Sequence, residues 1–339
     1  MPAAKDDPSD GTADATADAI ADGTAGSGAP RPLEAADEGF HAWPTECDTT
    51  WKENWYWNLA DRSAGVWGFF HTSFVRTEGK AVFAVCLMAG GRIRYHRNEI
   101  AIGDQGASPA LAPVLDDATL RVEIVAPHEQ HRVRVRTADY SLDLDYRARF
   151  APFSYSGRRI AANRQAIEHL RLKRYEQGMT VRGTCTLHDD GREVAIDCLG
   201  HRDHSWGRRD EGRIDGWNWA AVQLPSSTIN LTRSFSGDVF NVNGFVSTAA
   251  GNVGVVEVDF ETLEMESDGR TPLATRYTFR DENGAVRHLR SRRFSDLFEP
   301  VRSLRAAQKT VIFENFADYE LEETGEKGWG IDEYQRHYR

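Results

Sequence analysis

The chain has 339 residues, of which 40% are hydrophobic, and its formal net charge is −11. This length predicts two domains or one large β-domain. No apolar run approaches the roughly 18–20 residues that cross a bilayer, so we expect no membrane span and leave peripheral membrane contact open. Residues 1–38 hold nine acidic and two basic side chains. The body is therefore close to neutral and has no basic surplus that would indicate a nucleic-acid partner.

The first 38 residues consist mainly of Ala, Asp, Gly, Thr and Pro and contain almost no large apolar side chains. They cannot form a core, so we predict a disordered acidic tail. No apolar stretch follows Lys5, so the tail is not a secretory signal, and a cytoplasmic location is expected. The four cysteines include no CxxC pair, which indicates neither a disulfide framework nor a structural zinc site.

Order is predicted to begin near Phe40, where a segment dense in aromatic residues starts. Its members are Trp43, Trp51, Trp55, Tyr56, Trp57, Trp67, Phe69, Phe70 and Phe74. Two interpretations stay open and are compatible: the core of a β-domain, or an aromatic wall for an apolar ligand. Glu53 lies inside this segment and is either a salt-bridged structural group or an acid with a raised pKa.

The following residues show period-two alternation, which is typical of antiparallel strands with one wet face. Strands are expected at residues 80–89, 91–102, 119–125, 132–136 and 140–146. Residues 150–166 break the pattern and mark the predicted domain junction, with a short helix expected at 158–168. The N-terminal β-domain is thus placed at residues 39–155.

The second half, residues 156–339, repeats the β pattern and forms the predicted C-terminal domain. A hairpin is expected at residues 179–199, around the turn Asp189-Asp190-Gly191. Further strands are expected at residues 217–224, 228–235, 239–248, 253–260, 274–279, 286–293 and 310–322, with one or two helical turns at 300–308. The whole chain is predicted to be all-β, as two antiparallel barrels or sandwiches with little helix.

The segment of residues 200–210 holds two His, three Arg, two Asp and a Trp. On a strand, His201, Asp203 and Ser205 face one side, and Arg202, His204 and Trp206 face the other. If either face lines a closed cavity, its ionisable groups must be paired or have shifted pKa values. Two interpretations remain: a general acid–base pair whose protonation is set by Arg, or a structural salt-bridge cluster that joins two sheets.

Other chemistries fit this segment poorly. His201-Arg202-Asp203 resembles a kinase catalytic loop, but Arg208 stands where that loop needs Asn. A metal shared by Asp203 and His204 would need a bent strand, because adjacent side chains point to opposite sides. No phosphate loop, dinucleotide fingerprint or Gly-x-Ser-x-Gly motif is present. We therefore expect neither a metal nor another cofactor.

Two further segments hold candidate ligand-binding residues. Trp217 and Trp219 share a strand face, as either sheet core or part of a ligand wall. Glu333 lies between a Gly-rich turn and Tyr334 near the end of the chain, where a final strand would close a barrel and turn the carboxyl inward.

The sequence G-H-R-D-H-S-W-G-R at residues 200–208 resembles the signature of bacterial proteins similar to carotenoid 1,2-hydratases, and more loosely to AttH-like and fungal Diels–Alderase-like proteins. Weaker similarities are found at residues 51–57, 174–177 and 328–333, so the resemblance covers about residues 45–335. It implies two lipocalin-like β-barrel domains, an apolar pocket, and water addition to an isoprenoid double bond. The final segment is then expected to pack back on the N-terminal domain.

The resemblance and the residues together predict a cofactor-independent hydratase or dehydratase that acts on an apolar, terpenoid-like or polycyclic molecule. Alkene hydration needs an acid to protonate carbon and a base to activate water. Asp203 is the expected acid, with His204 and Arg202 setting the local charge. His201, Glu53 or Glu333 is expected to hold water. The substrate-binding set is Trp206, Trp55, Tyr56, Trp217, Trp219 and Glu333.

Two other functions stay open: an isomerase or cyclase that uses the same acid and pocket, and a lipocalin-like protein that binds an apolar ligand without chemistry. In all three cases the partner is a small apolar molecule, and the oligomeric state is open.

Overall fold

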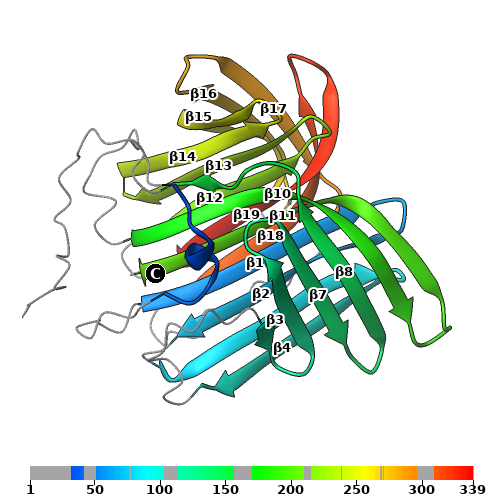
Figure 1. Cartoon of the computed structure of the whole chain (residues 1–339). Helices are drawn as coiled ribbons and strands as arrows, with labels where there is room; N and C mark the ends of the chain where they lie inside the picture. Colours follow the sequence, from blue (N-terminus) through cyan, green and yellow to red (C-terminus); the bar gives the residue numbers. More distant parts are fainter. Residues whose placement is uncertain are drawn as a thin grey trace, which may run out of the picture.

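The computed structural model describes residues 32–41, 51–75, 78–102, 114–155, 170–209, 215–237, 239–267, 269, 271–295 and 309–338. Within this part the chain forms antiparallel strands and one short 3₁₀ helix, η1 (Ala35–Glu38) (Figure 1). The predicted all-β, lipocalin-like fold is confirmed. No helix in these ranges has the length and apolar character needed to cross a bilayer.

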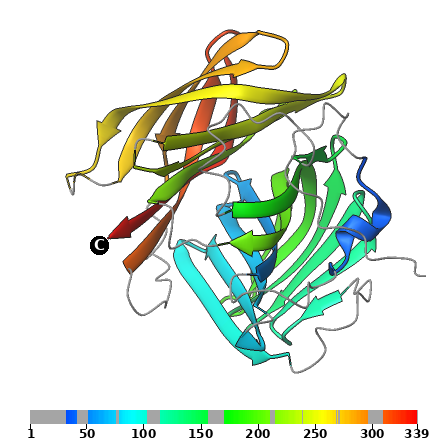
Figure 2. The ribbon, with the colours of Figure 1, turned by 90° about the vertical axis from the view of Figure 1, so that its left-hand side faces the viewer.

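The first sheet has 11 strands, and ten of them follow the order β4-β3-β2-β1-β11-β10-β8-β7-β6-β5, with β9 paired to β10. The strands are β1 (Trp51–Asp61), β2 (Val66–Val75), β3 (Lys80–Ala89), β4 (Arg92–Ala101), β5 (Val114–Asp116), β6 (Leu120–Ala126), β7 (Gln130–Arg136), β8 (Tyr140–Ala148), β9 (Phe153–Ser154), β10 (Leu170–Leu187) and β11 (Glu193–Arg209). The sheet curls into an open barrel (Figure 2). Its two edges are bridged by Asp117, which accepts a hydrogen bond from Asn98 Nδ2 at 3.1 Å.

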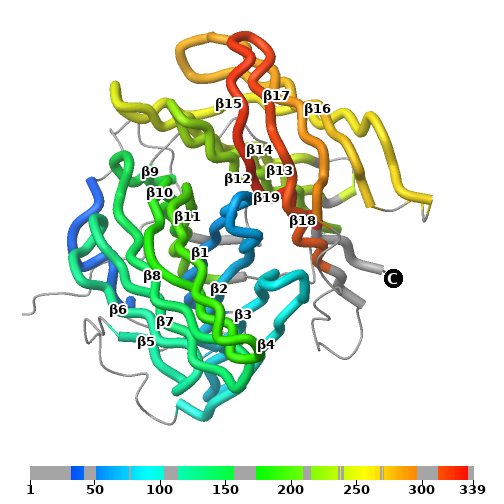
Figure 3. The backbone as a smooth tube through the Cα atoms, turned by 90° about the vertical axis from the view of Figure 1, so that its right-hand side faces the viewer, coloured from blue at the N-terminus to red at the C-terminus, as the bar shows by residue number. Residues whose placement is uncertain are grey.

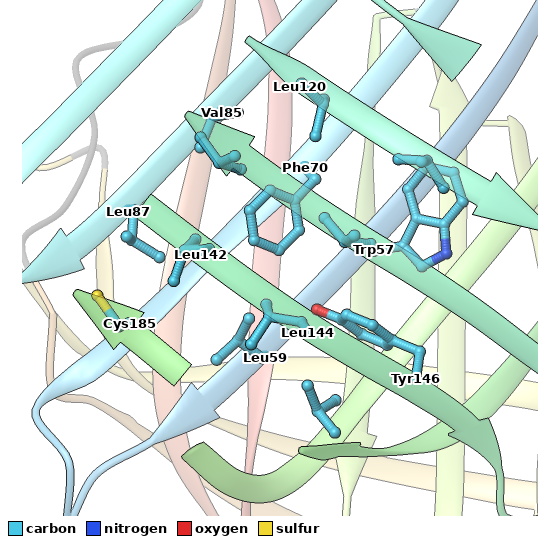
Figure 4. Close-up of a cluster of buried hydrophobic side chains, with 14 of the residues drawn as sticks. Trp57, Leu59, Phe70, Val85, Leu87, Leu120, Leu142, Leu144, Tyr146 and Cys185 are labelled. Carbon is cyan, nitrogen blue, oxygen red and sulfur yellow. The ribbon is translucent and has the colours of Figure 1, made fainter. Parts of the chain in front are cut away.

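The inner face of this sheet holds a hydrophobic core. In Figure 4, Trp57, Leu59 and Phe70 lie among Leu142, Leu144 and Tyr146, and all are buried. The alternating apolar positions of β8 thus meet the aromatic segment of β1 and β2. Trp57 and Phe70 therefore belong to the core of the β-domain, which is the first of the two interpretations of the aromatic segment.

The second unit is a closed barrel of β12 to β19 in sequence order (Figure 3). Its strands are β12 (Gly216–Gln223), β13 (Ser227–Ser236), β14 (Val239–Thr248), β15 (Gly251–Met265), β16 (Pro272–Asp281), β17 (Val286–Arg293), β18 (Lys309–Leu321) and β19 (Glu326–Tyr338). Ala220, Leu231, Phe279 and Tyr319 belong to its interior core.

The outer face of the barrel packs against the outer face of the first sheet. A third hydrophobic cluster joins them, with Tyr56 and Phe69 from the sheet and Trp219, Phe316 and Ile331 from the barrel. The end of the chain, β19, therefore packs against the first sheet. The layer between the two units is called the interdomain layer below.

The strand pairing differs from the predicted division at residues 155 and 156. β10 pairs with β8, and β11 pairs with β1, so both complete the first sheet, and the closed barrel begins at Gly216. Alternation within a strand is a local property and carries no information about its partner strand. The segment of residues 200–209 thus belongs to the first unit.

The predicted disordered tail is wrong for residues 32–38, and its first 31 residues lie outside the described ranges. η1 forms at Ala35–Glu38, and Asp37 and Glu38 are buried. Polar contacts with the first sheet hold this segment in place. Its composition therefore lacked the large apolar residues from which a folded segment is predicted. The helical segments expected at 158–168 and 300–308 also lie outside the described residues.

Candidate functional site

β1 and β11 pair side by side and place the predicted site residues on two opposite faces. The register sets Trp55 opposite His204 and Tyr56 opposite Asp203. The inner face of the first sheet receives Glu53, Trp55, Arg202, His204 and Trp206. The interdomain layer receives Tyr56, His201 and Asp203 from the sheet and Trp217, Trp219 and Glu333 from the barrel. The alternation inferred for residues 201–206 is therefore observed, and it divides the predicted catalytic set.

The inner cluster is organised around the buried ion pair of Arg202 and Glu38. Arg202 Nη1 and Nη2 donate to the two carboxylate oxygens of Glu38 at 2.8 and 3.0 Å. The Tyr175 hydroxyl donates to Glu38 at 2.8 Å and accepts from Arg202 Nη1 at 3.0 Å. Burial acts to raise the pKa of Glu38, but the positive charge of Arg202, together with His131 and His204, outweighs it and holds the pKa well below its ordinary value. Glu38 is thus ionised.

A second part of the inner cluster links His204, Glu53 and His41. Glu53 Oε1 lies 3.2 Å from His204 Nε2 and 2.7 Å from His41 Nδ1. Burial raises the pKa of Glu53, but hydrogen bonds with both histidines outweigh it and leave the pKa lowered, whereas burial lowers the pKa of His204. His204 stacks on Trp55 at 4.2 Å, and His41 stacks on Trp206 at 3.6 Å.

These inner residues are packed on every side. Arg202 and His204 have 0% exposure, and their side chains point away from the barrel. A molecule in the interdomain layer would be separated from them by the backbone of β11. His204, Arg202 and Glu53 therefore do not meet Asp203, contrary to the grouping expected from the sequence.

On the interdomain face, His201 and Glu176 form a buried pair. His201 Nε2 lies 2.8 Å from Glu176, and Gln223 Nε2 donates to His201 Nδ1 at 3.2 Å. Because Gln223 Oε1 accepts from Thr228, its amide nitrogen faces His201, so the imidazole proton lies on Nε2 and is donated to Glu176. Since Gln223 and Thr228 belong to β12 and β13, this pair joins the sheet to the barrel.

Glu176 is surrounded by donors. Arg174 lies 3.1 Å away, and the Tyr155 hydroxyl and Trp219 Nε1 donate to it at 3.2 and 3.3 Å. Burial acts to raise the pKa of Glu176, but the charge of Arg174 and the bond with His201 outweigh it, and the pKa is lowered. Glu176 is therefore a carboxylate with its partners in place.

A second carboxyl pair lies in the interdomain layer. Glu314 of β18 and Glu333 of β19 stand directly opposite each other. Glu314 is buried, and burial together with the negative charge of Glu333 raises its pKa well above the ordinary value. Two adjacent carboxyl groups, one of them buried, cannot both ionise at neutral pH. The pair therefore holds a proton.

Aromatic side chains surround this pair. Trp217 Nε1 donates to Glu333, and Trp219, next to Glu333 across the strands, lies 5.7 Å from Tyr56 in an edge-to-face arrangement. The pKa of Tyr56 is raised well above its ordinary value, chiefly by burial and further by the neighbouring acidic groups Glu314, Glu333 and Asp203. Three carboxyl groups, from both units, thus surround the Tyr56 hydroxyl.

The interdomain layer reaches solvent at this position. Asp203, Trp217 and Glu333 are half-buried, whereas Glu314 and Trp219 are buried. The open side of the layer is thus lined by two carboxyl groups and an indole, with a protonated carboxyl group behind them. This arrangement can give a proton to, or take one from, an apolar molecule.

Sequence reasoning missed four residues of these clusters: Glu38, His41, Glu176 and Glu314. Glu176 lies in the segment of residues 174–177 that contributed to the resemblance. Glu314 shares a strand face with Ile312 and Phe316, and a carboxyl flanked by apolar residues on one face is a signal that was available. Glu38 and His41 gave no such signal, because their partners lie far away in the sequence.

Solved structures share this fold. A candidate AttH from Nitrosomonas europaea has a TM-score of 0.65 and 14% identity, covering 87% of this chain and 96% of that chain. Kievitone hydratase from Nectria haematococca has a TM-score of 0.58 and 11% identity, with coverage of 85% and 89%. CghA has a TM-score of 0.61 and 13% identity, with coverage of 88% and 94%.

Among curated protein sequences, none matches the chain significantly. A family model does match, over residues 34–338, and its description is "Domain of unknown function (DUF7064)". This range includes both the inner cluster and the interdomain layer, and the chain therefore belongs to the DUF7064 family.

Proposed function

We propose that the protein is an acid–base enzyme, a hydratase or dehydratase, that acts on an apolar, terpenoid-like or polycyclic substrate in the interdomain layer. The observation that carries this proposal is the carboxyl pair of Glu314 and Glu333, which holds a proton beside Trp217 and Tyr56 and across from Asp203. The structural similarity to kievitone hydratase supports the class of reaction.

Hydration of an alkene begins with transfer of a proton to carbon, which needs a strong acid that is still protonated at neutral pH. The Glu314–Glu333 pair supplies this proton through Glu333, which lies at the half-exposed side of the layer. The carbocation that forms lies among Tyr56, Trp217 and Trp219. Their π faces each stabilise a nearby cation by roughly 0.5–2 kcal/mol.

Water then adds to the cation and gives up one proton. Asp203 is placed to accept it, because it faces the same layer and lies within electrostatic reach of Arg174, whose positive charge favours a carboxylate. The proton returns from Asp203 to the carboxyl pair through solvent, so the cycle consumes one alkene and one water. In reverse, the same groups dehydrate a tertiary alcohol. The proton donor is thus assigned to the carboxyl pair, and Asp203, the acid expected from the sequence, acts as the base.

The test is incubation of the purified protein with a panel of isoprenoid alkenes in H₂¹⁸O, followed by mass spectrometry. A hydratase adds one labelled water to a substrate. Glu333→Gln and Asp203→Asn are each expected to lower turnover by at least about 100-fold, the lower range for general acid–base catalysis. Glu320→Gln changes an exposed carboxyl on β18 and should leave turnover unchanged.

Other outcomes would contradict the proposal. A product of unchanged mass would show an isomerase or cyclase. Tight retention of an unaltered ligand would show a binding protein. Full turnover in folded Asp203→Asn and Glu333→Gln variants would remove these residues from the mechanism.

A further inference from the structure

His41, Glu53 and His204 bring three ligand-type atoms together inside the first sheet. One atom from each residue lies within 4.8 Å of the others, and Glu53 Oε1 lies 2.7 Å from His41 Nδ1 and 3.2 Å from His204 Nε2. Zinc binds nitrogen and oxygen at about 2.0–2.1 Å, so neighbouring ligands of a tetrahedral ion lie roughly 3.3 Å apart. The three residues therefore have the spacing of a metal-ligand set, although hydrogen bonds alone would give similar distances.

The number of protons on these side chains distinguishes a metal-ligand set from a set of hydrogen bonds. Tyr175 has one hydroxyl proton, and it is donated to the ionised Glu38 at 2.8 Å. Toward His204 Nδ1, 3.2 Å away, the Tyr175 oxygen is therefore an acceptor, and Nδ1 carries the imidazole proton. In a neutral ring this leaves the lone pair of Nε2 facing a carboxylate oxygen of Glu53. Either a second proton or a cation must lie between these two atoms.

His41 offers the same arrangement. Its Nε2 lies 3.6 Å from the carboxylate of Asp37, and its Nδ1 faces Glu53. A proton on Nε2 would turn the Nδ1 lone pair toward the centre of the trio. In metal sites, ligating histidines usually direct their second nitrogen at an oxygen, which fixes the tautomer and the ring. Tyr175 occupies this position for His204, whereas the distance from His41 Nε2 to Asp37 is beyond a hydrogen bond, and Trp55 and Trp206 hold the two rings by stacking.

We propose that His41, Glu53 and His204 bind a divalent transition-metal ion of the zinc class. Two imidazoles and one carboxylate leave a fourth position for water, as in many zinc sites with three protein ligands. The ion would fasten the segment that carries His41 to β1 and β11. This site lies on the face of β11 opposite to Asp203, so the proposal is independent of the proposed hydratase activity.

The experiment uses the full-length protein, stripped of metal with a chelator and dialysed into metal-free buffer. Titration with ZnCl₂ by calorimetry is expected to give one tight site per chain, and CoCl₂ is expected to give visible d–d absorption of low-symmetry Co²⁺. His41→Gln and Glu53→Gln should weaken binding by at least tenfold. His41→Gln changes a half-buried ring on the segment before β1, and the fold of this variant is checked by circular dichroism.

The matched control is His288→Gln. His288 Nδ1 lies 2.7 Å from Glu323, the same distance as in the His41–Glu53 pair, but the His288–Glu323 pair is more exposed and belongs to the barrel. This variant should bind zinc as tightly as the unchanged protein. Absence of a stoichiometric site in the unchanged protein, or equal affinity in His41→Gln, would overturn the proposal and leave a buried imidazolium–carboxylate pair in its place.

Discussion

Among single residues, Glu314 is predicted to make stability depend on pH in a direction opposite to most carboxyl groups. Burial and Glu333 raise its pKa well above 4.5, so the unfolded state loses this proton at a lower pH than the folded state. The free energy of unfolding should therefore fall as pH rises above 4.5, by up to about 1.4 kcal/mol per pH unit, until the folded group also ionises.

Glu314→Gln should remove this slope, so that the variant gains stability relative to the unchanged protein between about pH 5 and pH 8. Urea unfolding across this range measures the difference. Glu320→Gln, an exposed carboxyl on the same strand, should keep the original slope. Equal slopes in Glu314→Gln and the unchanged protein would mean that the Glu314 carboxyl is ionised in the folded state at neutral pH.

Among the strands, β10 and β13 approach each other at Gly178. A Cβ at this position would lie 1.9 Å from Thr228 Oγ1, so any residue other than glycine requires Thr228 or the barrel to shift. Gly178→Ala should cost about 1–3 kcal/mol of stability, as overpacking of a well-packed contact does. Thr228→Ala removes the clashing oxygen, so the double variant should lose less stability than the sum of the two single variants.

Gly183→Ala is the control for this cycle. A Cβ there would lie 1.9 Å from the backbone oxygen of Asp143, within the first sheet, and the φ of Gly183 is +156°. Thr228→Ala should recover none of the stability that Gly183→Ala loses. Chemical unfolding of the three single variants, the two double variants and the unchanged protein measures both couplings. Strict additivity for Gly178 and Thr228 would contradict the contact between β10 and β13.

The strands also show which features were predictable from the sequence. Alternation is local, so the two faces of residues 201–206 were inferred correctly before any partner was known. The pairing of β1 with β11 joins residues about 150 positions apart. The alternation of apolar and polar residues contains no information about strand pairing over such a separation. The same limit explains Glu38, whose bond to Arg202 spans 164 positions.

For the whole molecule, the N-terminal segment is predicted to be part of the folded unit. Glu38 supplies the carboxylate for Arg202, which has 0% exposure. Deleting residues 1–41 would leave a buried guanidinium without this partner, at a cost of about 3–5 kcal/mol. The deletion also removes Phe40, which packs edge-to-face on Trp55 and Phe74. A deletion of residues 1–31 keeps all of these contacts and should therefore cost less stability than the deletion of residues 1–41.

A second substitution separates the charge from the packing. In the chain without residues 1–41, Arg202→Met replaces a buried cation that has lost its carboxylate by an apolar side chain, and it should recover part of the lost stability. In the full-length chain the same substitution removes the guanidinium that balances the Glu38 carboxylate, and it should destabilise the protein. Chemical unfolding in the presence of a chelator, with the two deletions and both Arg202→Met forms, measures this sign reversal. If Arg202→Met changed stability equally in both backgrounds, the Glu38–Arg202 pair would not couple the N-terminal segment to the sheet, and the loss on deletion would come from Phe40 and its neighbours alone.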